Sequence, residues 1–205
     1  MTLKIYGVIQ SRAFRTVWCA EELSIPYERI EIGFDGVTNR TPAFLAINPN
    51  GRIPAIVDNG FALWESLAIN LYLAKKHAAG SLYPTTLEDE ARQWQWSLWT
   101  ANEIEPPIGQ WAYHTLILPE KERDPEKAKS ALEELEQPFA VLDGVLGRSS
   151  YLTHPTTFRV ADLNLAATLS RTLSMDWTRR PNLGRWLKQC CDRPAARKAL
   201  ALRKS

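Results

Sequence analysis

Ser11 is the first residue whose type and position could do chemistry. It stands between a short apolar run, residues 3–8, and a helical pattern that begins near Ala13. At a helix start the backbone N–H groups are unpaired and the helix dipole is positive, so an anion such as a thiolate is stabilised there. A hydroxyl donor adds a charge-assisted hydrogen bond. The alternative is structural: Ser11 is an N-cap that accepts one backbone N–H.

Two further segments with polar residues lie where a predicted helix or strand begins or ends. Asn48-Pro49-Asn50-Gly51 is a turn signal, and Arg52-Ile53-Pro54 follows it directly. Glu65-Ser66 begins a helical pattern, where a hydroxyl and free N–H groups hold a carboxylate. As an isolated pair, Glu-Ser is more often a capping device, so its meaning depends on the surrounding elements.

The first part of the chain alternates strands and helices. Asp58-Asn59-Gly60 between two short apolar runs is a strong hairpin signal. The pattern predicts βαβαββα, with strands at 3–8, 27–32, 55–57 and 61–63 and helices at 13–23, 41–47 and 65–76.

The second part is wholly helical. Residues 80–86 contain Gly, Pro and Thr and predict a linker, which gives domains at 1–79 and 87–205. We expect Pro106-Pro107 to kink the first helix of the second domain and Pro138 to disturb the next one, because proline removes a donor. Helical patterns cover about 87–118, 124–146, 160–172, 181–191 and 194–203.

Composition narrows the function classes. The 205 residues are 45% hydrophobic with eight tryptophans, which is ample for a packed core. The net charge of +2 is spread evenly and argues against nucleic-acid binding. No apolar run approaches the roughly 20 residues of a membrane span, and the start lacks a signal-peptide pattern, so we expect a cytoplasmic protein. The three cysteines have no metal-ligand spacing, so we expect neither a metal site nor disulfides.

Taken together, the motifs resemble those of a known family. Ser11 with Arg15 four positions on, the 48–54 segment, Trp64-Glu65-Ser66 and Val160-Ala161-Asp162 occur in the order found in cytosolic glutathione S-transferases of the serine type, theta-like or bacterial. The resemblance implies an α/β thioredoxin-like N-terminal domain with a mixed sheet and an all-α C-terminal domain. It also implies glutathione as co-substrate, a small hydrophobic electrophile, a homodimer and a cleft between the domains.

The resemblance assigns roles to residues. Ser11 would activate the thiol; Ile53-Pro54 would be a cis peptide whose Ile53 main-chain groups bind the cysteinyl part of glutathione as an added strand does. Glu65 and Ser66 would hold the γ-glutamyl ammonium and carboxylate. Arg40 or Arg52 would pair the glycyl carboxylate.

Thiol activation can be given a magnitude. A free thiol has a pKa of about 8.5, and lowering it by about 2 units requires about 2.7 kcal/mol. One charge-assisted hydrogen bond is worth about 1.5–3 kcal/mol. We therefore expect Ser11 and the helix start to suffice together, without a general base.

Four residues beyond the Pro106-Pro107 kink are candidates for the second-substrate pocket, with core packing as the alternative. They are Ile108, Trp111, Tyr113 and His114.

Asp162 resembles the family's buried aspartate at a helix start, but Arg159 stands where the family has Ser or Thr as N-cap. Either Thr157 substitutes, or the cap is weaker by about 1 kcal/mol.

Three other functions stay open. Ser11-Arg12-Ala13-Phe14 occupies the place of the Cys-x-x-Cys of thioredoxin-like redox proteins, and without the sulfurs a reductase is disfavoured. A noncatalytic transferase-like scaffold is the second, because fold does not fix function. A glutathione-dependent dehalogenase, peroxidase or isomerase is the third; Gln10 before Ser11 disfavours the isomerase.

Overall fold

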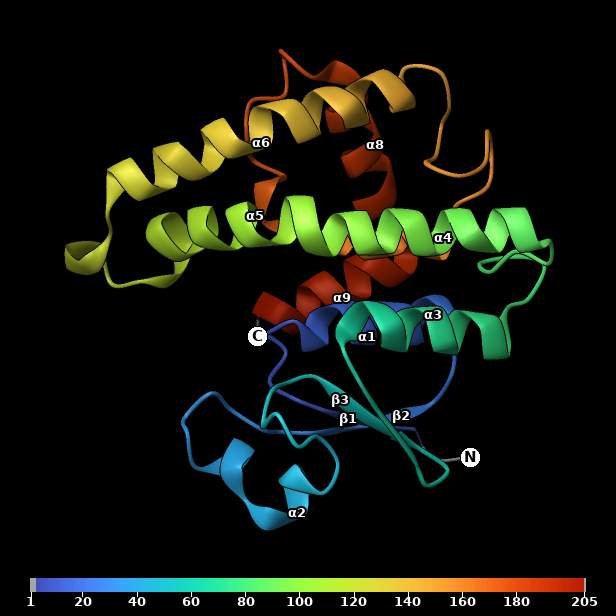
Figure 1. Ribbon diagram of the computed structural model, residues 1–205, viewed down its shortest axis with the longest axis vertical. Coiled ribbons are helices and arrows are strands. Elements are labelled where there is room, and N and C mark those ends of the chain that lie inside the picture. Colours follow the sequence, from blue (N-terminus) through green and yellow to red (C-terminus); the bar gives the residue numbers. More distant parts are fainter. Residues whose placement is uncertain (1–2, 205) are drawn as a thin grey trace. The chain divides into compact units, whose positions relative to one another are not determined.

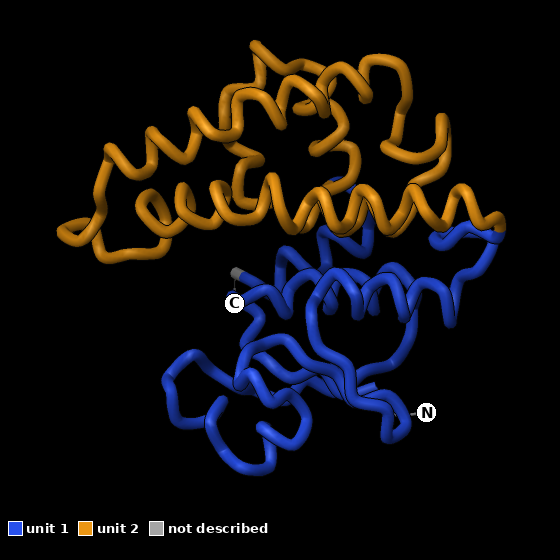
Figure 2. The backbone as a smooth tube through the Cα atoms, viewed as in Figure 1, with its two compact units in different colours: residues 1–85, 192–205 blue, residues 86–191 orange. Residues whose placement is uncertain are grey.

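A computed structural model describes residues 3–204 and divides the chain into two compact units. The first combines the chain up to Thr85 with the segment from Asp192 onward, and the second is Thr86–Cys191 (Figure 2). The sequence places the whole C-terminal stretch from residue 87 with the helical domain, whereas in the structure its last helix, α9 (Pro194–Lys204), packs in the first unit.

The reason lies in the contacts of α9 with α1 (Ala13–Glu22). Arg193, just before α9, forms an ion pair with Glu22, and Lys198 Nζ lies 2.7 Å from Glu21. At the other end, the guanidinium of Arg203 lies over the Phe14 ring, 4.6 Å from its centroid. Helix α9 thus closes one side of the first unit's core.

The first unit contains a four-stranded mixed sheet. Its strands are β1 (Leu3–Tyr6), β2 (Tyr27–Ile30), β3 (Ala55–Asp58) and β4 (Phe61–Trp64) in the order β2-β1-β3-β4. Strand β1 pairs parallel with β2 and antiparallel with β3, which pairs antiparallel with β4. The predicted thioredoxin-like arrangement is confirmed.

Helices cover both faces of this sheet (Figure 1). Helices α1 and α3 (Ser66–His77) lie on one face, where α9 packs against α1, and α2 (Pro42–Leu45) lies on the other. Side chains of β1 alternate accordingly: Leu3 and Ile5 are buried, while Tyr6 contacts Phe44 of α2.

The second unit is all helical, as predicted. It contains α4 (Leu87–Trp99), α5 (Glu105–Ala112), α6 (Pro125–Leu146), α7 (Val160–Leu169) and α8 (Pro181–Cys191). Every residue of α7 is buried, because this helix is apolar nearly all round and lies at the centre of the unit.

Prolines act differently in the two long helices. A π-helical turn, Thr100–Ile104, joins α4 to α5 just before Pro106-Pro107. This irregular turn accommodates the backbone N–H donors that the two prolines lack. Helix α6 instead continues through Pro138 without a break. Glu134, whose carbonyl loses its intrahelical donor, is exposed, and water can replace that donor.

The start of α7 is capped from outside the helix. Asp162 Oδ2 accepts the Arg159 N–H at 3.1 Å. A guanidinium carries no hydrogen-bond acceptor, so the Arg159 side chain cannot accept a backbone N–H of α7 in return. Gln93 of α4 supplies it: its Oε1 accepts the Ala161 N–H at 3.2 Å. The proposed substitute, Thr157, makes no side-chain hydrogen bond to the start of α7 within residues 3–204, and its N–H donates to His154 Nδ1.

No helix among residues 3–204 is long and apolar enough to cross a membrane.

Candidate functional site

The pairing of the strands brings three separate motifs to one edge of the sheet. Tyr6, the last residue of β1, is paired with Ala55, the first of β3, and Ala55 is paired with Trp64, the last of β4. The segments that carry Ser11, Ile53-Pro54 and Glu65-Ser66 therefore leave or enter the sheet at the same level.

Ser11 lies just before α1 and is 9% exposed. Its Oγ accepts the Ala13 N–H at 3.0 Å, and its hydroxyl donates to the Val8 carbonyl at 2.6 Å. Ser11 thus satisfies the N–H of the first residue of α1, although Arg12 is the N-cap residue, and its single proton has a neutral acceptor. A ligand thiolate would have to compete with the Val8 carbonyl for that proton.

Gly7 allows Ile53 to approach the start of α1. Its φ is +136°, and a Cβ at this position would lie 3.0 Å from Ile53 Cβ and 3.1 Å from Ala13 Cβ. The Ile53-Pro54 peptide is cis, as the resemblance implies. Within residues 3–204, the N–H and C=O of Ile53 make no hydrogen bond, so both are available to an extended peptide.

Glu65 has an unusual backbone conformation. Its φ is +73°, which a non-glycine residue rarely adopts and which costs about 1–3 kcal/mol. Such strain is typical of functional sites. Glu65 is exposed, and it gives α3 no side-chain cap, so the helix start is not closed by its own N-cap residue.

Ser66, the first residue of α3, is 4% exposed and tied to α1. Its Oγ accepts from Arg15 Nη1 at 3.2 Å. Arg15 is itself only 7% exposed, and its carbonyl accepts Asn70 Nδ2 of α3 at 3.3 Å. The sequence pattern contains Arg15 but assigns it no role. Its spacing of four from Ser11, the length of about one helical turn, is the signal that could have found it.

The two candidate arginines for the glycyl carboxylate are both exposed. Arg40 Nη1 lies 3.4 Å from the Asn50 carbonyl, and its side chain packs against Gly51, whose φ is +59°. Arg52 contributes its carbonyl, which accepts Asn48 Nδ2 at 2.6 Å. Asn48 therefore shapes the turn, and the guanidinium of Arg40 extends along it.

The four candidates for the second-substrate pocket lie in the second unit and differ in exposure. Ile108 and Trp111 are 5% and 9% exposed, as core residues are. Tyr113 is 50% exposed in a π-helical turn, Tyr113–Ile117. His114 Nδ1 accepts the Asp124 N–H at 3.3 Å, so this ring secures the start of α6. Two neighbours of Tyr113 that the sequence reading missed, Leu116 and Ile117, are about half exposed.

Other chemistries find little support in the described part of the chain. No group of three or more His, Cys, Asp or Glu among these residues could hold a metal ion. Cys19 is fully buried in α1, and burial raises the pKa of its thiol far above the usual range, which leaves it unreactive.

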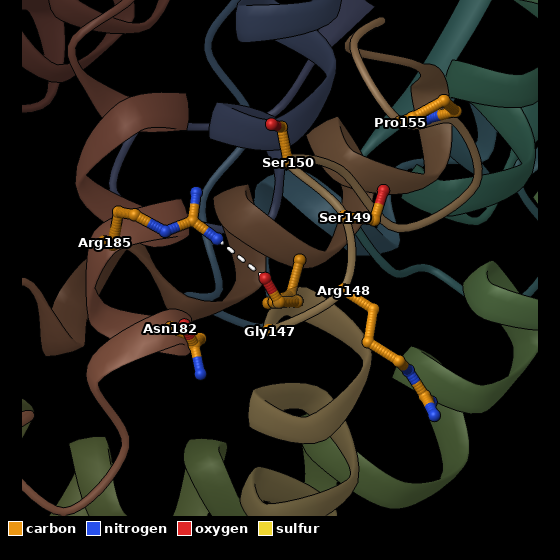
Figure 3. Close-up of a pocket in the computed structure, with 8 residues that line it drawn as sticks. Gly147, Arg148, Ser149, Ser150, Pro155, Asn182 and Arg185 are labelled. Atoms are coloured by element: carbon orange, nitrogen blue, oxygen red, sulfur yellow. Dashed lines mark hydrogen bonds between the residues drawn. The ribbon is translucent and has the colours of Figure 1, made fainter.

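A polar pocket in the second unit contains none of the predicted site residues. It lies between the end of α6 and the start of α8 (Figure 3). Arg185 donates to the Leu146 carbonyl at 2.7 Å, and Arg148 extends away from Arg185, so the two guanidinium groups do not converge on one ligand.

Comparison with known proteins agrees with this geometry. Residues 1–75 match the family model of the glutathione S-transferase N-terminal domain, a range that includes Ser11, Ile53 and Ser66. The chain is 32% identical over 186 residues to glutathione S-transferase GstB of Escherichia coli K12, covering 89% of each chain.

The chain belongs to the glutathione S-transferase family.

Two other proteins are similar to this transferase. The theta class glutathione S-transferase of Xanthomonas axonopodis pv. citri, solved with glutathione bound, superposes with a TM-score of 0.87 at 30% identity and 96% coverage of both chains. Human elongation factor 1-gamma is 33% identical over 172 residues, which is 80% of this chain and 38% of that protein. The serine-type identification agrees with the theta-class neighbour.

Proposed function

We propose that the chain binds glutathione at the sheet edge formed by Ser11, Ile53 and Ser66 and transfers its thiolate to a small hydrophobic electrophile. One observation carries the proposal: three segments distant in sequence meet at one level of the sheet, and two of them retain hydrogen-bonding groups suited to a peptide. These are the unpaired main chain of Ile53 and the open start of α3.

Each part of glutathione then has a matching group. The main chain of Ile53 pairs with the cysteinyl residue, and Ser66 with the α3 N-terminus receives the γ-glutamyl carboxylate. Exposed Glu65 meets the neighbouring ammonium. For the glycyl carboxylate we favour Arg40, because its guanidinium lies along the 50–51 turn, over Arg52.

The thiol of glutathione lies at Ser11. Because the Ser11 hydroxyl already donates to the Val8 carbonyl, its contribution to lowering the thiol pKa is smaller than the sequence predicts. Donating to a thiolate exchanges a neutral hydrogen bond worth about 1 kcal/mol for a charged one worth about 2 kcal/mol. The net gain of about 1 kcal/mol lowers a pKa by less than one unit. The start of α1 must supply the remainder.

For the electrophile we propose contacts with Tyr113 and its exposed neighbours Leu116 and Ile117, while Ile108 and Trp111 support them from the core. An apolar substrate gains by covering such side chains. His114 holds the α6 start and needs no role as a base.

The direct test combines binding and turnover. We expect retention on glutathione resin, elution by free glutathione, and conjugation of an aryl halide well above the uncatalysed rate. Failure to bind glutathione at millimolar concentration would remove the proposal.

The similarity to elongation factor 1-gamma favours one second candidate, a noncatalytic scaffold. It predicts weak glutathione binding and no conjugation of any of a panel of aryl halides, epoxides and alkyl halides. Turnover of one member of the panel excludes it.

We also propose a cytoplasmic homodimer. Helix α4 presents an apolar row at helical spacing whose members include Leu87, Trp94 and Leu98, exposed by 72%, 48% and 64%. The three buried free cysteines suit a reducing compartment.

A further inference from the structure

The contact between Arg15 and Ser66 has a direction. A guanidinium carries only donors, so at 3.2 Å the Ser66 Oγ must be the acceptor. A serine hydroxyl has one proton of its own, and within residues 3–204 the Ser66 hydroxyl has no other hydrogen-bond partner. Its proton is therefore left without an acceptor, although the side chain is 4% exposed.

The charge of Arg15 lies in a region shielded from solvent. The side chain is 7% exposed, and a guanidinium stays protonated at any physiological pH. Coulomb interactions are less screened at such a position than at the surface. An anion bound at the start of α3 would feel this charge through Ser66 as well as the helix dipole.

We propose that Arg15 is a positioning residue that holds Ser66 ready to donate to the γ-glutamyl carboxylate of glutathione and so selects thiols that carry this carboxylate. The inference rests on the proposed function. Arg15 occupies one acceptor site of Ser66 Oγ, which turns the hydroxyl proton toward the ligand. The same buried charge favours an anionic ligand over a neutral or cationic one.

A purely structural role is the competing explanation. The Arg15 carbonyl accepts Asn70 Nδ2, so the residue also joins α1 to α3. Loosening that junction would weaken every thiol ligand alike. The proposal instead predicts a loss confined to ligands that carry the γ-glutamyl group.

The test compares two ligands that differ by this group. Dissociation constants of S-hexylglutathione and S-hexylcysteinylglycine are measured by calorimetry on the full chain. The hexyl group raises both affinities into a measurable range, and the ratio of the two constants does not depend on the folded fraction. We expect Arg15→Gln to lower the preference for S-hexylglutathione at least tenfold and Arg15→Lys, which keeps the charge, to lower it less.

Three further variants locate the effect. Ser66→Ala should lower the same ratio, and Arg15→Gln combined with Ser66→Ala should lower it by no more than another twofold, since both act on one interaction. Arg29→Gln is the matched control: it removes one positive charge from β2, where Arg29 pairs with Glu31 at 2.7 Å, and should leave the ratio within twofold.

The outcomes separate the two proposals. A preference lost in Ser66→Ala but kept in Arg15→Gln overturns the role of Arg15 and leaves the glutathione site standing. Equal affinities of the unmodified chain for both ligands overturn the γ-glutamyl site itself, and the Arg15 proposal with it.

Discussion

At the scale of single residues, the hydroxyl of Ser11 accepts the first N–H of α1 and is also the candidate hydrogen-bond donor to the thiolate. Its bond to the Val8 carbonyl means that donation to sulfur exchanges one bond for another. We expect Ser11→Ala to raise the pKa of the thiol of bound glutathione by about 0.7 unit, because only about 1 kcal/mol of net stabilisation is lost. Ultraviolet absorbance of the bound thiolate against pH measures this shift.

The matched control is Ser81→Ala, which also removes a hydroxyl that donates to a main-chain carbonyl in the first unit, that of Ala78. It should leave the pKa of the bound thiol unchanged. A shift of 2 units or more in Ser11→Ala would mean that the hydroxyl donates to sulfur without losing its bond to Val8.

Asp162 gives a prediction for stability against pH. Its carboxyl is fully buried, and desolvation raises its pKa to about 6 despite three donors, from Leu152, Trp186 and Arg159. Because the folded pKa exceeds the ordinary value, the stabilisation is complete below about pH 4 and is lost as pH rises through about 6. The loss amounts to about 3 kcal/mol at most.

Urea unfolding of the chain and of Asp162→Asn from pH 4 to pH 7 checks this expectation. The difference in unfolding free energy between them should fall by up to about 3 kcal/mol over that range. Asp176→Asn serves as control, because Asp176 is exposed and its pKa is lowered by hydrogen bonds from Thr178. A difference independent of pH for Asp162→Asn would show that its pKa is not raised.

At the scale of elements, the start of α7 depends on a side chain from α4. Gln93 is fully buried; its Oε1 accepts from Ala161, and its Nε2 donates to Thr153 Oγ1 at 2.9 Å. We expect Gln93→Ala to lower the free energy of unfolding by about 2–3 kcal/mol, since it removes a cap and leaves buried partners unpaired. Urea denaturation measures the change.

Two other variants sharpen this prediction. Thr157→Ala should cost less than about 0.5 kcal/mol, because the Thr157 side chain makes no hydrogen bond to α7 within residues 3–204 and its N–H bond to His154 is kept. Arg159→Ser introduces a local N-cap and should restore about 1 kcal/mol in the Gln93→Ala background. If Thr157→Ala is the more costly change, the cap has been assigned to the wrong residue.

At the scale of the whole molecule, the apolar row on α4 predicts association of two copies. We expect sedimentation equilibrium to give a dimer, and Leu87→Glu with Leu98→Glu to raise its dissociation constant at least tenfold, because burying unpaired charges is costly. Val141→Glu is the control: Val141 is 41% exposed but lies on α6, outside the row. Equal effects of both changes would place the interface elsewhere.

The sequence by itself determined the elements and their order. Alternation, turn signals and helical spacing depend on neighbours along the chain, so the βαβαββα pattern and the helical segments could be read locally. The motif set also determined the family, since the order of Ser11, Ile53-Pro54 and Glu65-Ser66 needs no coordinates.

Only the tertiary structure decided which groups meet and which hydrogen bonds are already made. Gln93 caps a helix 68 residues away, Arg15 reaches Ser66 across 51 residues, and α9 returns to the first unit. The Ser11 proton is held by Val8, which reduces the thiol activation expected from the sequence. Such partners are set by packing between elements, and periodicity along one element carries no information about them.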